Sequence, residues 1–148
     1  SEPRMFRKKV IILVLLICFI AITVSALFTI NKRHTDWVID AYVAALENAK
    51  LNFSDYHETG NKSSYTKGVT ALNNAVQIIL TDGERLDIYQ ERQALMASYS
   101  ILSLHPSSID DNIPMLLSAL DRIINDPQKR VSYGELLDFY NVCNHTTG

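Results

Sequence analysis

The feature that most restricts this chain is an uninterrupted apolar run over residues 10–30, VIILVLLICFIAITVSALFTI. It contains no charged residue, and its polar side chains are Thr23, Ser25 and Thr29, whose hydroxyls can hydrogen-bond to a helix carbonyl. Roughly 20 apolar residues form a helix long enough to cross a hydrocarbon layer of about 30 Å. The run therefore predicts a transmembrane helix. We interpret this helix as an anchor that attaches the rest of the chain to a membrane.

The apolar run divides the 148-residue chain into parts of unequal size. Residues 1–9 form a basic N-terminus, residues 10–30 the transmembrane helix, residues 31–35 a short linker, and residues 36–148 one small domain. The linker has neither glycine nor proline and is too short to act as a flexible tether. We therefore expect the domain to lie close to the bilayer.

Basic residues flank the apolar run unequally. Four precede it and two follow it: Arg4, Arg7, Lys8 and Lys9, then Lys32 and Arg33. Because flanking Lys and Arg residues are retained in the cytoplasm, this bias predicts a cytoplasmic N-terminus and an extracytoplasmic domain, in a periplasm or a lumen. The same residues give no reason to expect a nucleic-acid partner, since they lie against the membrane segment and the formal net charge is -2.

A cleaved secretory signal is the competing interpretation of the N-terminal residues. A basic start, an apolar middle and the sequence Val24-Ser25-Ala26 suit cleavage by a signal peptidase. The apolar character continues through Leu27 and Phe28, however, and so exceeds the usual signal core of about 7 to 15 residues. We expect a retained anchor, with a processed soluble protein as the alternative.

Beyond residue 35, apolar residues recur at spacings of three and four, the period of a helix with one buried face. Breaks fall at Gly60, at His105-Pro106 and at Asp126-Pro127. The stripes are Val38, Tyr42, Ala45, Ala49, Phe53, Tyr56; then Tyr65, Val69, Leu72, Val76, Ile79; then Ile88, Leu95, Tyr99, Leu102; then Ile113, Leu117, Leu120, Ile124.

These stripes, with no alternating strand pattern beside them, predict an all-α fold class. The expected architecture is a single N-terminal transmembrane helix followed by an antiparallel bundle of about five helices, because short turns favour antiparallel neighbours. A weak similarity between ALNNAVQIILTD and ALDRIINDP leaves a helical-repeat solenoid as an alternative.

Local signals predict where several helices begin. Thr81 and Glu84 form a capping box that should open a helix running to about Leu104. Pro114 is tolerated in a first turn, so the following helix should begin near residues 111–113.

The last helix has the clearest signature of this kind. Ser132 and Glu135 form a second capping box, and Val131 can pack against Leu136 across the helix start. At the other end of the domain, a cap at residues 35–36 should open its first helix.

The chain has four histidines and two cysteines, and none stands in a metal-binding or catalytic pattern. Cys18 lies in the apolar run and Cys143 near the C-terminus, where a frayed tail would supply neither a positioned base nor a pocket, so we expect no disulfide and no thiol nucleophile. Acidic pairs fall in first turns, where they favour the helix macrodipole. No glycine-rich phosphate loop is present. We predict that the protein is not an enzyme and expect neither a cofactor nor a metal.

Two surfaces are candidates for contact with partners. Within the apolar run, Ala21, Ser25 and Thr29 recur at spacing four and form a face of small residues suited to close helix contact in lipid. In the domain, most of the seven tyrosines fall on the apolar stripes and should lie in the core.

Tyr133 and Tyr140, on the helix that closes the bundle, are the exceptions that could leave an aromatic face free for a partner. Trp37 is added to this surface, or could lie at the membrane interface. We therefore predict a membrane-anchored helical interaction module, an accessory or assembly subunit whose partners are the membrane and other membrane protein subunits. The alternatives are a secreted or periplasmic helical inhibitor or immunity-type protein, and a small-ligand sensor domain.

Overall fold

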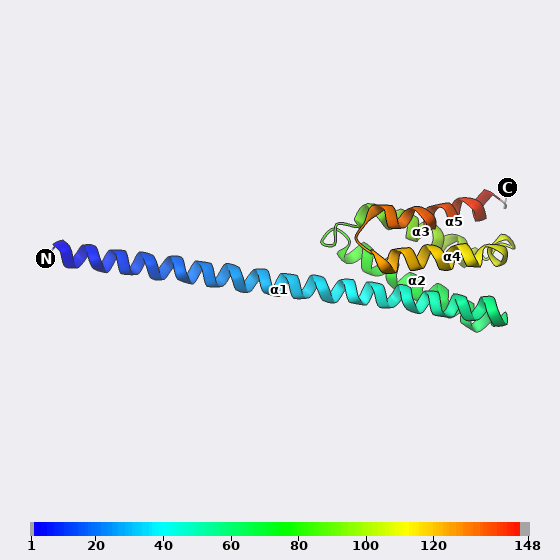
Figure 1. Cartoon of the computed structure of the whole chain (residues 1–148), viewed down its shortest axis with the longest axis horizontal. Helices are drawn as coiled ribbons and strands as arrows, with labels where there is room; N and C mark the ends of the chain where they lie inside the picture. Colours follow the sequence, from blue (N-terminus) through cyan, green and yellow to red (C-terminus); the bar gives the residue numbers. More distant parts are fainter. Residues whose placement is uncertain (1, 146–148) are drawn as a thin grey trace. The chain divides into compact units, whose positions relative to one another are not determined.

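The computed structural model of this protein describes residues 2–145, which are mostly helical and contain no β-strand, so the predicted all-α fold class is confirmed (Figure 1). Five α-helices follow one another: α1 Glu2–Thr59, α2 Lys62–Asp82, α3 Arg92–Leu104, α4 Ser108–Asn125 and α5 Gly134–His145. Two 3-10 turns, η1 Tyr89–Glu91 and η2 Arg130–Tyr133, precede α3 and α5. The chain divides into two compact units, Ser1–Asp36 and Trp37–Gly148.

The first unit contains the N-terminal part of α1, which is long and apolar enough to cross a membrane. None of its apolar window is buried by the protein itself. The hydroxyls of Thr23 and Thr29 donate hydrogen bonds to the carbonyl oxygens of Phe19 and Ser25, at 2.8 and 2.9 Å, as the sequence predicted. The hydroxyls of these two threonines are thus satisfied within their own helix, as a helix in lipid requires.

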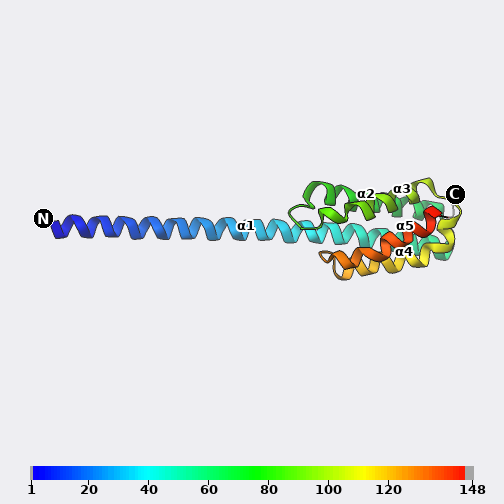
Figure 2. The ribbon, with the colours of Figure 1, turned by 90° about the horizontal axis from the view of Figure 1, so that it is seen from above.

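The second unit contains five helical segments that pack in a ring, namely residues 37–59 of α1 together with α2 to α5. Figure 2 shows α2 and α3 on one side of α1 and α4 and α5 on the other. Going round the ring, α1 lies beside α2 and α4, α2 packs on α3, and α5 packs on both α3 and α4. Lys50 and Tyr56 of α1 bind Asp121 and Asp110 of α4, so these two helices run antiparallel.

The hydrogen bonds that set the direction of the other neighbours are Tyr65 to Leu102 between α2 and α3, and Ser108 to Cys143 and Arg122 to Glu135 between α4 and α5. Each joins the start of one helix to the end of the other and so indicates an antiparallel pair. A closed ring with an odd number of helices must contain one parallel pair, and here that pair is α3 and α5.

The predicted apolar stripes form the core of this unit. Phe53, Leu72, Leu95, Ile113 and Leu120 are among the fully buried residues, each on a predicted stripe. The other core positions on the stripes are Val38, Tyr42, Ala49, Tyr65, Val76, Ile79, Ile88 and Leu102, with Ala45, Tyr56, Val69, Tyr99, Leu117 and Ile124 packed against them. Helical periodicity therefore identified which side of α1 to α4 is buried.

The capping box at Thr81 is the first boundary prediction that is wrong. Helix α2 continues through Thr81 to Asp82, and α3 begins only at Arg92. The intervening chain is held as a turn because Leu86 and Ile88 are buried in the core. Burial of these two side chains outweighs the local preference for a helix start at Thr81.

Pro114 is the second correction, because it lies inside α4 rather than in its first turn. The helix begins at Ser108, so the carbonyl of Asp110 has no N–H donor four residues later. Ile109 and Ile113 are both fully buried. Extending the helix by a turn before Pro114 places Ile109 in the core, and this offsets the missing hydrogen bond.

The start of α5 also differs from its predicted form. The Glu135 carboxylate accepts hydrogen bonds from Ser118 at 3.0 Å and Arg122 at 2.6 Å on α4, instead of reaching back to Ser132. Val131 is 70% exposed, so most of its side chain is in solvent rather than packed across the helix start. The predicted cap at residues 35–36 is likewise wrong, because these residues lie within the continuous helix α1.

Candidate functional site

The predicted face of small residues in the apolar segment lies on the surface of α1. Ala21, Ser25 and Thr29 are all exposed. Thr29 donates its hydroxyl hydrogen to the Ser25 carbonyl, so its methyl group and hydroxyl oxygen are what it presents at this face. The packing of a second helix on this face stays a prediction.

The predicted aromatic surface is separated by the fold. Tyr133 is 1% exposed and belongs to the core, so its predicted role in a free aromatic face is wrong. Tyr140 is half-buried against the core, whereas Trp37 is 67% exposed. Trp37 lines a shallow hollow of about 290 Å³ between α1 and α2, with Val38, Ala41 and Ile78 among its walls.

The hydroxyl oxygens of Tyr42 and Tyr133 meet in the core, 2.9 Å apart. Tyr133 donates its only hydroxyl hydrogen to the carbonyl oxygen of Pro127 at 2.6 Å, so Tyr42 is the donor between the two rings. Burial raises the pKa of Tyr133 to about 12 and the pKa of Tyr42 well above its usual range, so both hydroxyls stay protonated. The pair joins α1 to the turn that precedes α5.

This donor order predicts unequal effects of two matched substitutions. Tyr133→Phe leaves the buried Tyr42 hydroxyl without an acceptor and should lower the free energy of unfolding by about 2 kcal/mol. Tyr42→Phe leaves the Tyr133 bond to Pro127 intact and should cost about 1 kcal/mol or less. Chemical denaturation of the full chain in detergent, followed by circular dichroism, measures both. Equal losses from the two variants would contradict the assigned donor.

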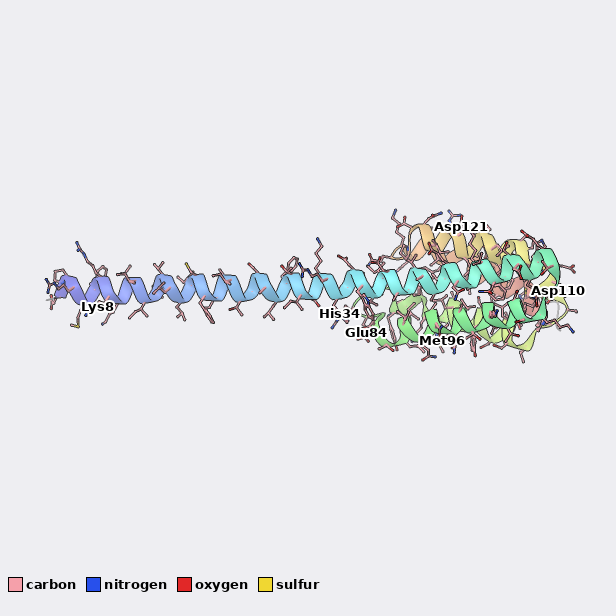
Figure 3. All side chains as sticks on the ribbon, turned by 90° about the horizontal axis from the view of Figure 1, so that it is seen from below. Lys8, His34, Glu84, Met96, Asp110 and Asp121 are labelled. Atoms are coloured by element: carbon pink, nitrogen blue, oxygen red, sulfur yellow. The ribbon has the colours of Figure 1, made fainter. Side chains whose placement is uncertain are left out.

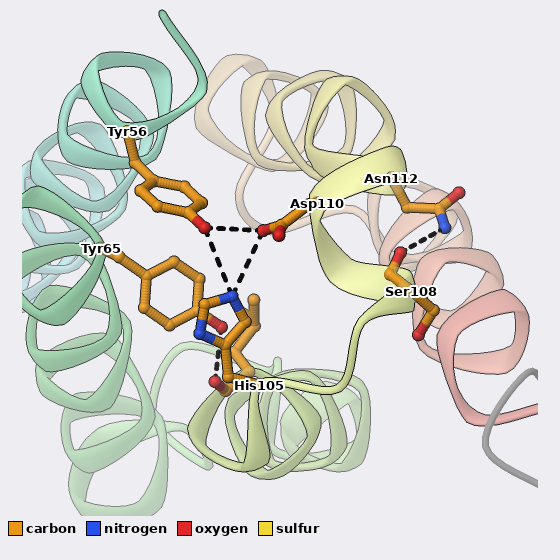
Figure 4. A network of polar contacts seen from close by, with 7 residues as sticks. Tyr56, Tyr65, His105, Ser108, Asp110 and Asn112 are labelled. Atoms are coloured by element: carbon orange, nitrogen blue, oxygen red, sulfur yellow. Dashed lines mark hydrogen bonds and ion pairs between the residues drawn. The ribbon is translucent and has the colours of Figure 1, made fainter. Parts of the chain in front are cut away.

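Four side chains form a polar and aromatic cluster at one end of the bundle, which we call the His105 cluster: Tyr56, Tyr65, His105 and Asp110 (Figure 4). Each comes from a different element, namely the end of α1, the start of α2, the residue that caps α3, and the first turn of α4. The Tyr56 hydroxyl donates to Asp110 Oδ1 at 2.7 Å, and His105 Nε2 lies 3.2 Å from the same oxygen.

Ring contacts complete the His105 cluster. The imidazole of His105 stacks on the Tyr65 ring with centroids 4.0 Å apart and planes inclined by 13°. Tyr56 meets Tyr65 edge to face at 4.9 Å. The Tyr65 hydroxyl donates to the Leu102 carbonyl oxygen at 2.5 Å, which satisfies one of the last carbonyls of α3.

The backbone at His105 explains why the ring points into this cluster. His105 has φ of 46°, in the left-handed region, and its N–H reaches the carbonyls of Ile101 and Leu102 to close α3. A non-glycine residue seldom adopts this conformation, although histidine does so more often than most. Pro106 prevents the helix from continuing, and the stacked ring contributes to holding the turn.

Within the His105 cluster, the hydrogen bond between Tyr56 and Asp110 shifts the pKa values of both groups away from neutral pH. The hydrogen bond from Tyr56, and then that from His105, lower the pKa of the Asp110 carboxyl. The hydrogen bond to Asp110 raises the pKa of Tyr56. A phenol that keeps its proton and a carboxylate that stays ionised are suited to holding four helix ends together rather than to exchanging protons with a substrate.

Removing the Tyr56 hydroxyl should therefore raise the pKa of Asp110. In Tyr56→Phe we expect that pKa to move up toward the ordinary value of about 3.9. Because the folded-state pKa is lowered, the stabilisation from Asp110 is complete above about pH 4 and is lost as the pH falls through the lowered value. Carboxyl ¹³C NMR of Asp110 in both proteins measures the shift. An unchanged midpoint would show that the bond to Tyr56 does not stabilise the carboxylate.

Among residues 2–145, no group of three His, Cys, Asp or Glu side chains is placed to hold a metal ion. Cys143, predicted to lie in a frayed tail, is instead fully buried in α5, which corrects that expectation. Burial raises the pKa of its thiol. A buried, protonated thiol is a packing group rather than a nucleophile.

The sequence did not predict the His105 cluster, because its members are separated by up to 54 positions and carry no motif. The one available signal was His105 directly before Pro106, which predicted the turn and not the contacts of the ring. Comparison with models of known protein families, with curated proteins and with solved structures finds no match.

Proposed function

We propose that this protein is a single-pass membrane protein whose helical domain, within the unit Trp37–Gly148, acts by binding other membrane protein subunits. The observation that carries the proposal is the apolar segment of α1, none of which the protein buries. Large side chains such as Phe19, Ile22 and Phe28 are more than two-thirds exposed. At about 25 cal/mol per Å² of apolar surface, such a segment needs an apolar environment, and a bilayer provides one.

The orientation in this proposal follows from the flanking charges. Four basic residues within residues 1–9 precede the segment and two within residues 31–35 follow it, which favours a cytoplasmic N-terminus. The bundle then lies in a periplasm or a lumen. Attaching a membrane-impermeant thiol or biotin label at a surface site of the bundle in intact cells tests this side assignment.

Binding rather than catalysis is the proposed role of the bundle. In support, Tyr56, His105 and Asp110 of the His105 cluster hydrogen-bond to one another, and Tyr42 and Tyr133 use their hydroxyls in the core. An accessory or assembly subunit needs a stable surface held near the membrane, and a bundle with a continuous buried core supplies it.

The test is co-purification from the native membrane in a mild detergent, with identification of the proteins recovered. Ala21→Leu together with Ser25→Leu should reduce recovery of a partner several-fold, because close helix packing in lipid needs small residues. Thr23→Leu together with Ala26→Leu adds similar volume away from that face and should leave recovery unchanged. Equal recovery from both double variants would remove the small-residue face from the proposal, and a chain recovered alone would remove the partner.

A secreted or periplasmic inhibitor is the second candidate, favoured by the small residues at Val24, Ser25 and Ala26. An N-terminal apolar helix is also what a signal sequence would form. The intact mass of the protein from its source separates the two candidates, because cleavage there leaves a chain that begins at Leu27.

A further inference from the structure

One end of the bundle is formed by the beginning of the second unit and two turns, and we call it the Trp37 end: Trp37, residues 82–91 and residues 126–133. Gln128 Nε2 donates to the Leu86 carbonyl at 3.2 Å and so joins the two turns. The Tyr42 to Tyr133 bond joins the second turn to α1. The His105 cluster lies at the other end of the bundle, and Figure 3 labels Glu84 and Asp110 at these opposite ends.

Two large apolar side chains project from the Trp37 end. Trp37 is 67% exposed beside its apolar hollow, and Val131 is 70% exposed on η2. With 70% of its surface exposed, Val131 does not fill the packing role that was predicted for it at the start of α5. Isolated exposed apolar residues are common, so exposure alone does not assign Trp37 and Val131 a role. Their distance from the membrane segment is the more informative property.

The charges of the Trp37 end do not select an anionic partner. Lys129 pairs with Asp126 at 2.8 Å, and Arg130 lies 3.8 Å from Glu91. The guanidinium of Arg92 lies over the Tyr89 ring, 3.9 Å from its centroid. The remaining charged side chains there, Asp82, Glu84, Arg85 and Asp87, include both signs. We therefore expect the Trp37 end to bind another surface through its exposed apolar side chains rather than through its charges.

The chain length limits how far Trp37 can lie from the end of the apolar run. Seven residue steps separate Ile30 from Trp37, which span at most about 25 Å when extended and about 10 Å when helical. The polar layer of a bilayer is about 5 to 8 Å deep on each side. The covalent connection alone therefore keeps the Trp37 end near the lipid interface, where tryptophan is favoured.

We propose that the Trp37 end of the bundle rests on the lipid surface, with the Trp37 and Val131 side chains inserted in the interface of zwitterionic lipid. This inference rests on the proposed membrane anchor. It assigns a lipid contact to a surface of the helical domain, in addition to the apolar segment. Two apolar contacts would hold the bundle on the bilayer and determine which of its faces a partner subunit can reach.

The test is spin labelling of the full chain in phosphatidylcholine nanodiscs with one chain per disc. Cys18→Ser removes the exposed thiol, and this parent should take no label because Cys143 is buried. Val131→Cys carries the label at the Trp37 end. Leu104→Cys is the matched control, an aliphatic residue that is 79% exposed at the opposite end of the bundle. Collision with oxygen reports lipid, and collision with a water-soluble nickel chelate reports solvent.

We expect the oxygen-to-nickel ratio at residue 131 to exceed that at residue 104 several-fold, and to be unchanged when anionic lipid is added. Trp37, the single tryptophan, should be quenched by lipids brominated near the headgroup. Equal ratios in chains that are embedded in discs overturn the lipid contact but leave the anchor. A contact that appears only with anionic lipid, or only with several chains per disc, assigns the end to headgroup charge or to a second copy and also overturns it. Failure of the chain to enter discs overturns the proposed function as well.

Discussion

Leu16→Arg together with Ile20→Arg is expected to move the protein from the membrane fraction to the soluble or aggregated fraction. An arginine near the centre of a membrane helix costs about 2.5 to 3.5 kcal/mol, so the pair costs about 6 kcal/mol. Both residues lie in the middle of the apolar run, where an arginine side chain is farthest from either interface. The measurement is resistance of the protein to alkaline carbonate extraction.

Leu16→Ala together with Ile20→Ala is the matched control, because it shortens the same side chains without adding charge. This variant should stay in the membrane pellet, since the rest of the apolar run is unchanged. If the double-arginine variant remained as resistant to extraction as the unmodified protein, the apolar segment would not lie in hydrocarbon. That outcome would remove the main support for the proposed function.

Phe53→Ala is expected to lower the free energy of unfolding by about 3 to 5 kcal/mol, the usual cost of truncating a buried aromatic ring. The Phe53 side chain is fully buried and meets the Tyr65 ring edge to face, with centroids 5.6 Å apart and planes at 74°. Leu51→Ala is the control, because Leu51 lies two positions away in α1 and is 70% exposed. Its effect should stay within about 0.5 kcal/mol. Denaturant unfolding in detergent, followed by circular dichroism, measures both, and similar losses would contradict the packing at Phe53.

The aromatic ring of Phe53 also restricts which residues can replace Gly68. A Cβ atom at Gly68 would lie 2.9 Å from Phe53 Cε1, so the two helices approach closely at this point. Gly68→Ala should lose about 1 to 3 kcal/mol through overpacking, offset by about 1 kcal/mol of improved helix propensity. Combining Gly68→Ala with Phe53→Leu makes room for the methyl group, and the double variant should lose less than the sum of the single ones. Additivity within about 0.5 kcal/mol would show that the two positions do not touch.

Much of the fold could be predicted because its determinants are periodic and local. The stripe through Tyr42, Ala49 and Phe53 identified the buried face of α1, and Gly60 identified where that helix ends. His105-Pro106 identified the end of α3. A three- or four-residue spacing specifies the same face whatever the neighbouring helix is, so these predictions did not depend on tertiary packing.

The errors fall where burial competes with local preference. The capping box at Thr81 is sound as a local signal, but Leu86 and Ile88 enter the core only if α2 continues and the chain then turns. Pro114 likewise lies inside α4 because the preceding turn buries Ile109. In each case the local backbone preference and the burial of apolar side chains both contribute about 1 to 3 kcal/mol. The core contacts that decide between them are not visible in the sequence.

The sequence by itself determined the apolar segment, the all-α class and the buried faces of the helices α1 to α4, because hydrophobicity and its period are properties of the chain. Only the tertiary structure decided that Tyr133 is a core residue, that Cys143 is buried, and that Val131 and Trp37 are exposed at one end of the bundle. It also assembled the His105 cluster from four separate elements. Contacts between distant residues depend on how the helices pack around one core, and that packing is settled jointly by all of them.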